Sequence, residues 1–115
     1  MSNPNIKTTE FVILGFGASG IGAAIELSKN KIPFIILEKD SNFGGCWNYA
    51  LNTSRLQTHK SYYKYDCVEY DDEVSNFPNK SEILDYFKKV INIFDLENTV
   101  IYDAEPTILN EENST

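Results

Sequence analysis

The chain has 115 residues, enough for one domain of common size. Its composition, 42% hydrophobic and 23% charged, is that of a globular chain with a core. The net charge of −7 argues against nucleic acid or an anionic membrane surface as a partner. Two cysteines are too few for a disulfide framework, so the expected location is a reducing cytoplasm. The single histidine, His59, has no Cys or His at ligand spacing, so we expect no metal site.

Two buried strands are predicted near the start of the chain. Residues 1–7 are polar and are expected to be disordered. The first strand is predicted over residues 8–14, where residues 11–14 form an uninterrupted apolar run. Such a run is typical of a strand that is buried on both faces of a sheet. Residues 33–38 predict the second strand. Although 11–25 are mostly apolar, their glycines and acidic flank disfavour a signal peptide or a membrane span.

Three glycines in the spacing Gly-x-Gly-x-x-Gly follow the first strand directly. Gly15 permits a tight turn, Gly17 has no Cβ to hold a pyrophosphate away, and Gly20 lets the next helix pack closely. This helix, predicted over residues 19–30, would direct its free N–H groups and the positive end of its dipole at phosphates. Glu38 follows Gly20 by 18 residues, a distance suited to hydrogen bonds with ribose hydroxyls. The pattern predicts a dinucleotide site, and the alternative is a glycine-rich turn in an ordinary strand–helix–strand unit.

A second glycine cluster lies in the loop predicted over residues 39–48. All six glycines of the chain lie within residues 15–22 or at Gly44 and Gly45. This concentration predicts that the backbone approaches something closely at two places. Trp47 follows in the same loop and is interpreted as lying near a flat aromatic ligand. The alternative interpretation is that Trp47 covers the edge of the core.

A second amphipathic helix is predicted over residues 79–95. Asn79 and Glu82 have the spacing of a capping box at its N-terminus. Apolar residues recur at helical spacing along one face and are interpreted as core: Ile83, Phe87, Val90, Ile91 and Phe94.

The segments on either side of this helix are less regular. Residues 49–72 lack a clean periodicity and predict an irregular excursion with at most one short strand. Residues 99–102 predict a third parallel strand, and residues 104–109 predict the beginning of a fourth. The polar residues 110–115 are expected to be a disordered tail.

Taken together, these motifs resemble the N-terminal part of the flavin-containing monooxygenases. The FAD segment of that family reads GxGxxG, then an acid that ends the second strand, then GGxW. Residues 15–20 supply the first part here, and residues 38–47 supply the acid and GGxW. GGxW at this offset separates these enzymes from NAD dehydrogenases. Weaker similarities lie in residues 56–60 and residues 77–83. The resemblance covers residues 8–109, nearly the whole chain.

The resemblance implies an α/β fold, specifically a partial Rossmann-like FAD-binding domain over residues 8–109. The expected sheet is mostly parallel, has three to four strands and is packed with two main helices. The resemblance also places Asn52 near the flavin as a catalytic residue. It implies FAD binding by a longer set of residues, which are Gly15, Gly17, Ala18, Ser19, Gly20, Glu38, Gly45, Trp47 and Gln57.

The activity implied by the resemblance is NADPH-dependent oxygenation of soft nucleophiles such as amines and sulfides. In the family, reduced FAD reacts with O₂ to give a C4a-hydroperoxide, and the cofactor carries the chemistry. Family members are several times longer, with a second GxGxxG for NADPH and a later strand that lies beside the strand equivalent to residues 11–14. The chain is therefore expected to be truncated before the NADPH-binding domain and to be inactive alone, either a dinucleotide-binding remnant or half of a split flavoenzyme. Its open sheet edge predicts self-association or pairing with a complementary chain.

Overall fold

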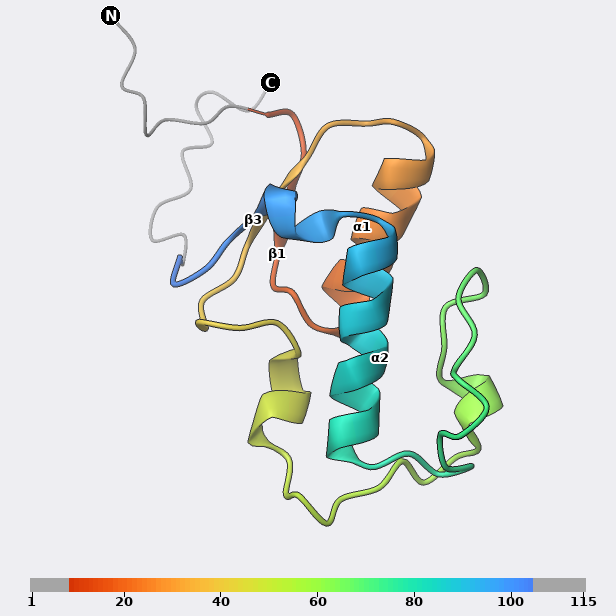
Figure 1. The fold of residues 1–115 in the computed structure, drawn as a ribbon. Helices are drawn as coiled ribbons and strands as arrows, with labels where there is room; N and C mark the ends of the chain where they lie inside the picture. Colours follow the sequence, from red (N-terminus) through yellow and green to blue (C-terminus); the bar gives the residue numbers. More distant parts are fainter. Residues whose placement is uncertain (1–8, 105–115) are drawn as a thin grey trace, which may run out of the picture.

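A computed structural model describes residues 9–104 and has a three-stranded parallel sheet with two main helices (Figure 1). The elements follow the order β1 (Val12–Leu14), α1 (Ala18–Lys29), β2 (Ile35–Leu37), η1 (Gly45–Tyr49), η2 (Lys60–Tyr62), α2 (Lys80–Ile93), η3 (Leu96–Thr99) and β3 (Val100–Ile101). The strand order is β1-β2-β3, and both neighbouring pairs are parallel. The predicted α/β class is therefore confirmed. The two segments expected to be disordered, and the predicted fourth strand from residue 105 onward, lie outside the described residues.

One face of the sheet packs against the core that α1 and α2 form with it. The pairing register places Ile13 beside Ile36, and Ile36 beside Val100. Ile36 is fully buried, and the other two side chains pack against the same hydrophobic core. The helices supply most of the remaining buried residues, which are Ile21, Ala24 and Ile25 from α1 and Ile83, Tyr86, Phe87, Val90 and Ile91 from α2.

The opposite face of the sheet is open in the described part of the chain. Val12 is 51% exposed and Leu14 is 63% exposed, although both belong to the apolar run of β1. The prediction that residues 11–14 are buried on both faces is therefore wrong for residues 9–104. The reason is topological, because both connections step across the sheet in the same direction. Right-handed crossovers then place α1 and α2 on the same side.

The two predicted helices are confirmed, each with small differences at its ends. The helix predicted over residues 19–30 is α1, and the helix predicted over residues 79–95 is α2. The Asn79 side chain accepts a hydrogen bond from Glu82 N at 2.9 Å, and the Glu82 carboxylate accepts one from Asn79 N at 3.1 Å. The predicted capping box is thus present, and it fixes the first turn of α2.

Glu82 should make the stability of the fold depend on pH. Its carboxylate accepts hydrogen bonds from the backbone and hydroxyl of Ser75 and from the backbone of Asn79, and these lower its pKa. A lowered pKa contributes stability above the pKa of the unfolded chain, and this contribution is lost as the pH falls through the folded-state value. Urea unfolding should show Glu82→Gln to be less stable than the wild type by about 1 kcal/mol at neutral pH. The difference should shrink at acidic pH, and a difference independent of pH would contradict this role.

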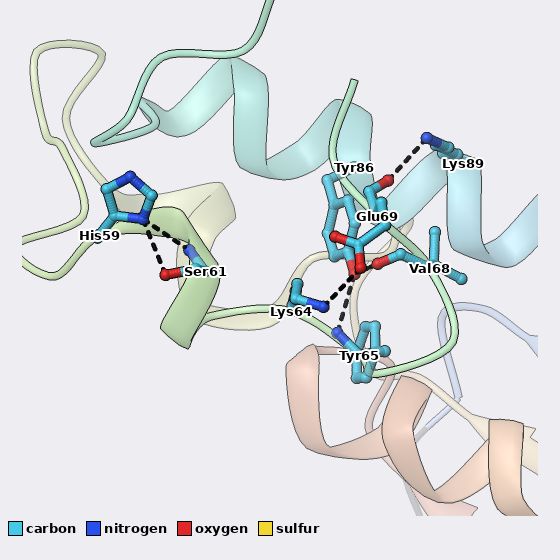
Figure 2. Close-up of polar contacts among 8 residues, drawn as sticks. All are labelled: His59, Ser61, Lys64, Tyr65, Val68, Glu69, Tyr86 and Lys89. Carbon is cyan, nitrogen blue, oxygen red and sulfur yellow. Dashed lines mark hydrogen bonds and ion pairs between the residues drawn. The ribbon is translucent and has the colours of Figure 1, made fainter. Parts of the chain in front are cut away.

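The irregular excursion between η1 and α2 is held by hydrogen bonds to one tyrosine of α2. The Tyr86 hydroxyl accepts from Tyr65 N at 2.9 Å and donates to Val68 O at 2.7 Å (Figure 2). Burial raises the pKa of Tyr86 to about 12, so the hydroxyl remains a donor across the physiological range. The sequence allowed at most one short strand here, and the structure has instead an isolated bridge between Arg55 and Asn79. The segment is therefore irregular, as predicted, but the hydrogen bonds of Tyr86 fix it to α2.

Candidate functional site

The carboxyl ends of β1 and β2 open onto a cavity of about 610 Å³. Ligands of open α/β sheets bind at this end of the strands, and the volume suits a small molecule or part of a cofactor. The wall is made from both strand ends, from η1 and from the chain after β3. It consists of Leu14, Gly15, Phe16, Gly17, Leu37, Glu38, Lys39, Asp40, Gly45, Cys46, Tyr49 and Ala104.

The turn from β1 into α1 needs glycine at two positions. Gly15 has φ +97°, a conformation that residues with a Cβ rarely adopt, and its N–H donates to Leu37 O at 2.8 Å. A Cβ on Gly20 would lie only 2.0 Å from the carbonyl oxygen of Gly15. The predicted tight turn and the close approach of the helix are therefore both confirmed.

The two glycine clusters pack against each other. A Cβ on Gly17 would lie 3.2 Å from Gly45 Cα, and a Cβ on Gly45 would lie 3.1 Å from Gly17 Cα. Gly44 N donates to Phe16 O at 2.9 Å and joins the two turns. The prediction that the backbone approaches something closely at two places is thus met in part by the approach of the two turns to each other. The missing Cβ of Gly17 makes room for the second turn, and the two turns together form one wall of the cavity.

Glu38 follows β2 and is held by the main chain. It is 3% exposed, and its Oε1 accepts a hydrogen bond from Phe16 N at 2.7 Å. Its Oε2 accepts one from Asp40 N at 2.8 Å. Each carboxylate oxygen has a further lone pair. The carboxylate is therefore fixed in the wall of the cavity and can still accept hydrogen bonds from ligand hydroxyls.

Tyr49 and Asp40 form a second polar contact at the same cavity. The Tyr49 hydroxyl donates to Asp40 Oδ1 at 2.8 Å, and this hydrogen bond raises the pKa of Tyr49. Cys46 also belongs to η1 and lines the cavity, and it has an exposed free thiol. Sequence reasoning missed all three residues. The only signal was their position, within two residues of Glu38 or of Trp47.

Three residues assigned by sequence lie away from the cavity wall. The Trp47 indole N–H donates to the Tyr63 hydroxyl at 3.0 Å, and its ring packs against the hydrophobic core. This placement agrees with the alternative that Trp47 covers the core edge. Asn52 and Gln57 are exposed and do not line this cavity.

The remaining assigned residues lie in the first turn of α1. Ala18 opens the helix, and its carbonyl accepts a hydrogen bond from the Tyr65 hydroxyl. Ser19 is exposed, and Gly20 packs on the turn below it. The structure thus brings Gly15, Gly17, Glu38 and Gly45 to one cavity, with these three residues beside it.

The described part of the chain contains neither a candidate metal site nor a candidate membrane span. Within residues 9–104, no group of three or more His, Cys, Asp or Glu residues could hold a metal ion. No helix in that range is long and apolar enough to cross a bilayer.

Several curated proteins are similar to this chain over most of its length. An uncharacterized monooxygenase, y4iD of Sinorhizobium fredii, is 33% identical over 112 residues, which cover 95% of the chain and 17% of that protein. The flavin-containing monooxygenase FMO GS-OX2 of Arabidopsis thaliana is 28% identical and covers 90% of the chain and 28% of its own length. The chain resembles the flavin monooxygenases. A probable indole-3-pyruvate monooxygenase of Arabidopsis thaliana, YUCCA7, is 27% identical over 74% of the chain and 20% of its own length.

Solved structures of flavin monooxygenases share this fold. An oxidized steroid monooxygenase bound to NADP superimposes with a TM-score of 0.77 and 26% identity, over 91% of this chain and 22% of that one. OTEMO in complex with FAD and NADP gives a TM-score of 0.72 and 21% identity, over 84% of this chain and 20% of that one. The chain matches no known family model. It spans between 17% and 28% of the curated monooxygenases described above.

Proposed function

We propose that this cavity binds FAD and that residues 8–109 form the FAD-binding part of a flavin monooxygenase. The observation that carries the proposal is the fixed Glu38 carboxylate beside two glycine turns that share one cavity. The sequence similarity to flavin monooxygenases supports the same assignment. The two exposed free thiols, Cys46 and Cys67, are compatible with a reducing cytoplasm.

The residues present fit the ADP half of FAD. The first turn of α1 has Gly17 as its N-cap and lacks a side-chain cap, so its N–H groups remain able to bind a pyrophosphate. In our proposal Gly15, Gly17 and the first turn of α1 hold the pyrophosphate. Glu38 accepts hydrogen bonds from the adenosine ribose. Neither role depends on Trp47, Asn52 or Gln57, which line other parts of the surface.

The activity we propose is NADPH-dependent oxygenation of soft nucleophiles such as amines and sulfides. Bound flavin would supply the oxygen chemistry, while the protein binds and orients the cofactor. The described residues contribute a cofactor cradle, and none of those lining the cavity forms a nucleophile and base pair. We therefore assign the chain itself to cofactor binding, and we propose that turnover requires further protein segments.

FAD binding tests the proposal directly. The purified chain, shown by circular dichroism to be folded, is titrated with FAD and followed by flavin absorbance and fluorescence. We expect saturable binding that ADP competes away, because the proposed contacts are all with the ADP half. A folded chain that binds neither FAD nor ADP would contradict the proposed function. NADPH oxidation by the loaded chain would show that it also turns over, against our expectation.

The sheet face that residues 9–104 leave open favours a second candidate, a non-catalytic unit whose open face is covered by another protein surface. Parallel sheets are normally covered on both faces, and here Val12 and Leu14 are half exposed or more. Phe11, also exposed, extends this apolar surface beside β1, which within residues 9–104 has β2 as its only strand neighbour. We propose that in a purified sample a second copy of the chain covers this face. In the cell the cover would be a second copy or a complementary chain.

Light scattering tests this association. We expect the purified chain to form dimers or larger species, because burial of aliphatic surface favours association by roughly 25 cal/mol per Å². Leu14→Lys should shift the chain toward monomer. Leu51→Lys is the matched control, because Leu51 is equally apolar, is 72% exposed and lies outside the sheet. A wild-type chain that is monomeric at high concentration would rule out self-association.

A further inference from the structure

Two aromatic side chains belong to the cavity wall, and they differ in accessibility. The Phe16 side chain is fully buried, whereas Tyr49 is 72% exposed. Of the residues lining this cavity, Tyr49 is thus the aromatic ring that a ligand can touch. Its position is set by the fold, because η1 begins at Gly45, which packs against Gly17.

The hydroxyl of Tyr49 identifies the end of the cavity that its ring occupies. It donates to Asp40 Oδ1 at 2.8 Å, and Asp40 N donates to Glu38 Oε2 at 2.8 Å. Asp40 therefore links η1 to the carboxylate proposed to hold the ribose, through its side chain on one side and its backbone N–H on the other. The Tyr49 hydroxyl therefore lies on the Asp40 side of Glu38, whereas the glycine turn contacts the other carboxylate oxygen through Phe16 N. A base attached to that ribose would extend in this direction, while the pyrophosphate extends toward Gly15.

We propose that Tyr49 stacks on the adenine ring of the nucleotide and that Asp40 positions the tyrosine. This inference rests on the proposed nucleotide site and adds to it a contact for the base. Tyrosine suits the task because its ring presents a flat apolar face and its hydroxyl has a fixed partner. Stacking on an aromatic side chain does not depend on which edge of the base is presented, so it supplements the ribose and phosphate contacts.

The test measures ADP binding by isothermal titration calorimetry with the full chain. Tyr49→Leu should weaken ADP binding about tenfold, which is within the range for the loss of one stacked base. Tyr49→Phe keeps the ring and should weaken ADP binding about threefold at most. Tyr62→Leu is the matched control, because Tyr62 is 84% exposed and does not line this cavity. It should leave ADP binding unchanged.

A second measurement does not depend on a substitution that alters the site. The chain is labelled with 3-fluorotyrosine, and the Tyr49 resonance is assigned by its absence in Tyr49→Phe. In ¹⁹F NMR this resonance should shift on addition of ADP and should stay in place on addition of inorganic pyrophosphate, which lacks a base.

The outcomes separate this inference from the proposed function. If the wild type binds ADP and Tyr49→Leu binds it equally well, the stacking role is overturned and the nucleotide site stands. If Tyr49→Phe loses as much affinity as Tyr49→Leu, the hydroxyl is responsible and stacking is again overturned. If the folded wild type fails to bind ADP, the proposed site itself is wrong and this inference falls with it.

Discussion

Replacing Gly20 with alanine is expected to lower the free energy of unfolding by about 3 kcal/mol, the upper part of the range for overpacking. The added Cβ would lie 2.0 Å from the carbonyl oxygen of Gly15, so either the turn or the first turn of α1 must move. Both belong to the proposed pyrophosphate site. FAD and ADP affinity should therefore fall more than tenfold, measured by urea unfolding and by FAD titration of the folded fraction.

Gly22→Ala provides the matched control in the same helix. A Cβ on Gly22 would make ordinary contact with the Tyr65 ring at 3.4 Å. Alanine is the better helix former, so this variant should be as stable as the wild type or more stable by up to about 1 kcal/mol. It should also bind FAD normally. Equal behaviour of the two variants would show that the close packing at Gly20 is unimportant.

Replacing Glu38 is expected to damage both stability and nucleotide binding. Glu38→Ala would leave Phe16 N and Asp40 N without their present partner, and we expect a loss of about 4 kcal/mol in unfolding free energy, since each unpaired group costs about 1–3 kcal/mol. Glu38→Gln keeps the shape of the side chain but replaces one carboxylate oxygen with an NH₂ group, which would face a main-chain N–H donor. It should cost about 2 kcal/mol.

Glu97→Gln is the control for loss of one negative charge. Glu97 is exposed and bonds to the Tyr102 hydroxyl at 3.2 Å, so its replacement should change the unfolding free energy by about 0.5 kcal/mol or less. Both Glu38 variants should also lose FAD affinity, because the ribose partner is removed or altered. A Glu38→Gln variant as stable as the wild type and still able to bind FAD would contradict the role assigned to this carboxylate.

Features of local origin were predictable from sequence. The glycine turn followed by α1 depends on conformations within a few residues, and so does the capping box at Asn79. The buried face of α2 follows from apolar spacing along one helix, which is why Ile83 and Phe87 were placed correctly. The parallel arrangement of the strands also follows, because a helix between two short strands favours a crossover connection.

Contacts between segments far apart in the chain could not be predicted from the sequence. Tyr86 is buried, and its hydroxyl anchors the irregular segment before α2. Nothing in the sequence distinguishes this tyrosine from other aromatic residues of a helix. The interpretation of Trp47 as a ligand contact rests on its place after two glycines in a loop, and its hydrogen bond to Tyr63, 16 residues further along an irregular segment, was not predicted. The contact between Tyr49 and Asp40 had no signal beyond the position of these residues close to Trp47 and Glu38.

The sequence by itself determined that a glycine turn joins an apolar strand to a helix and that an acidic residue follows the second strand. Such features are set by glycine conformation and apolar spacing, which act over a few residues. Only the tertiary structure decided that Gly17 and Gly45 pack against each other and that Glu38 is held by two main-chain N–H groups. It also decided that residues 9–104 leave one face of the sheet open. These depend on which remote segments meet, and that is settled by the packing of the whole chain.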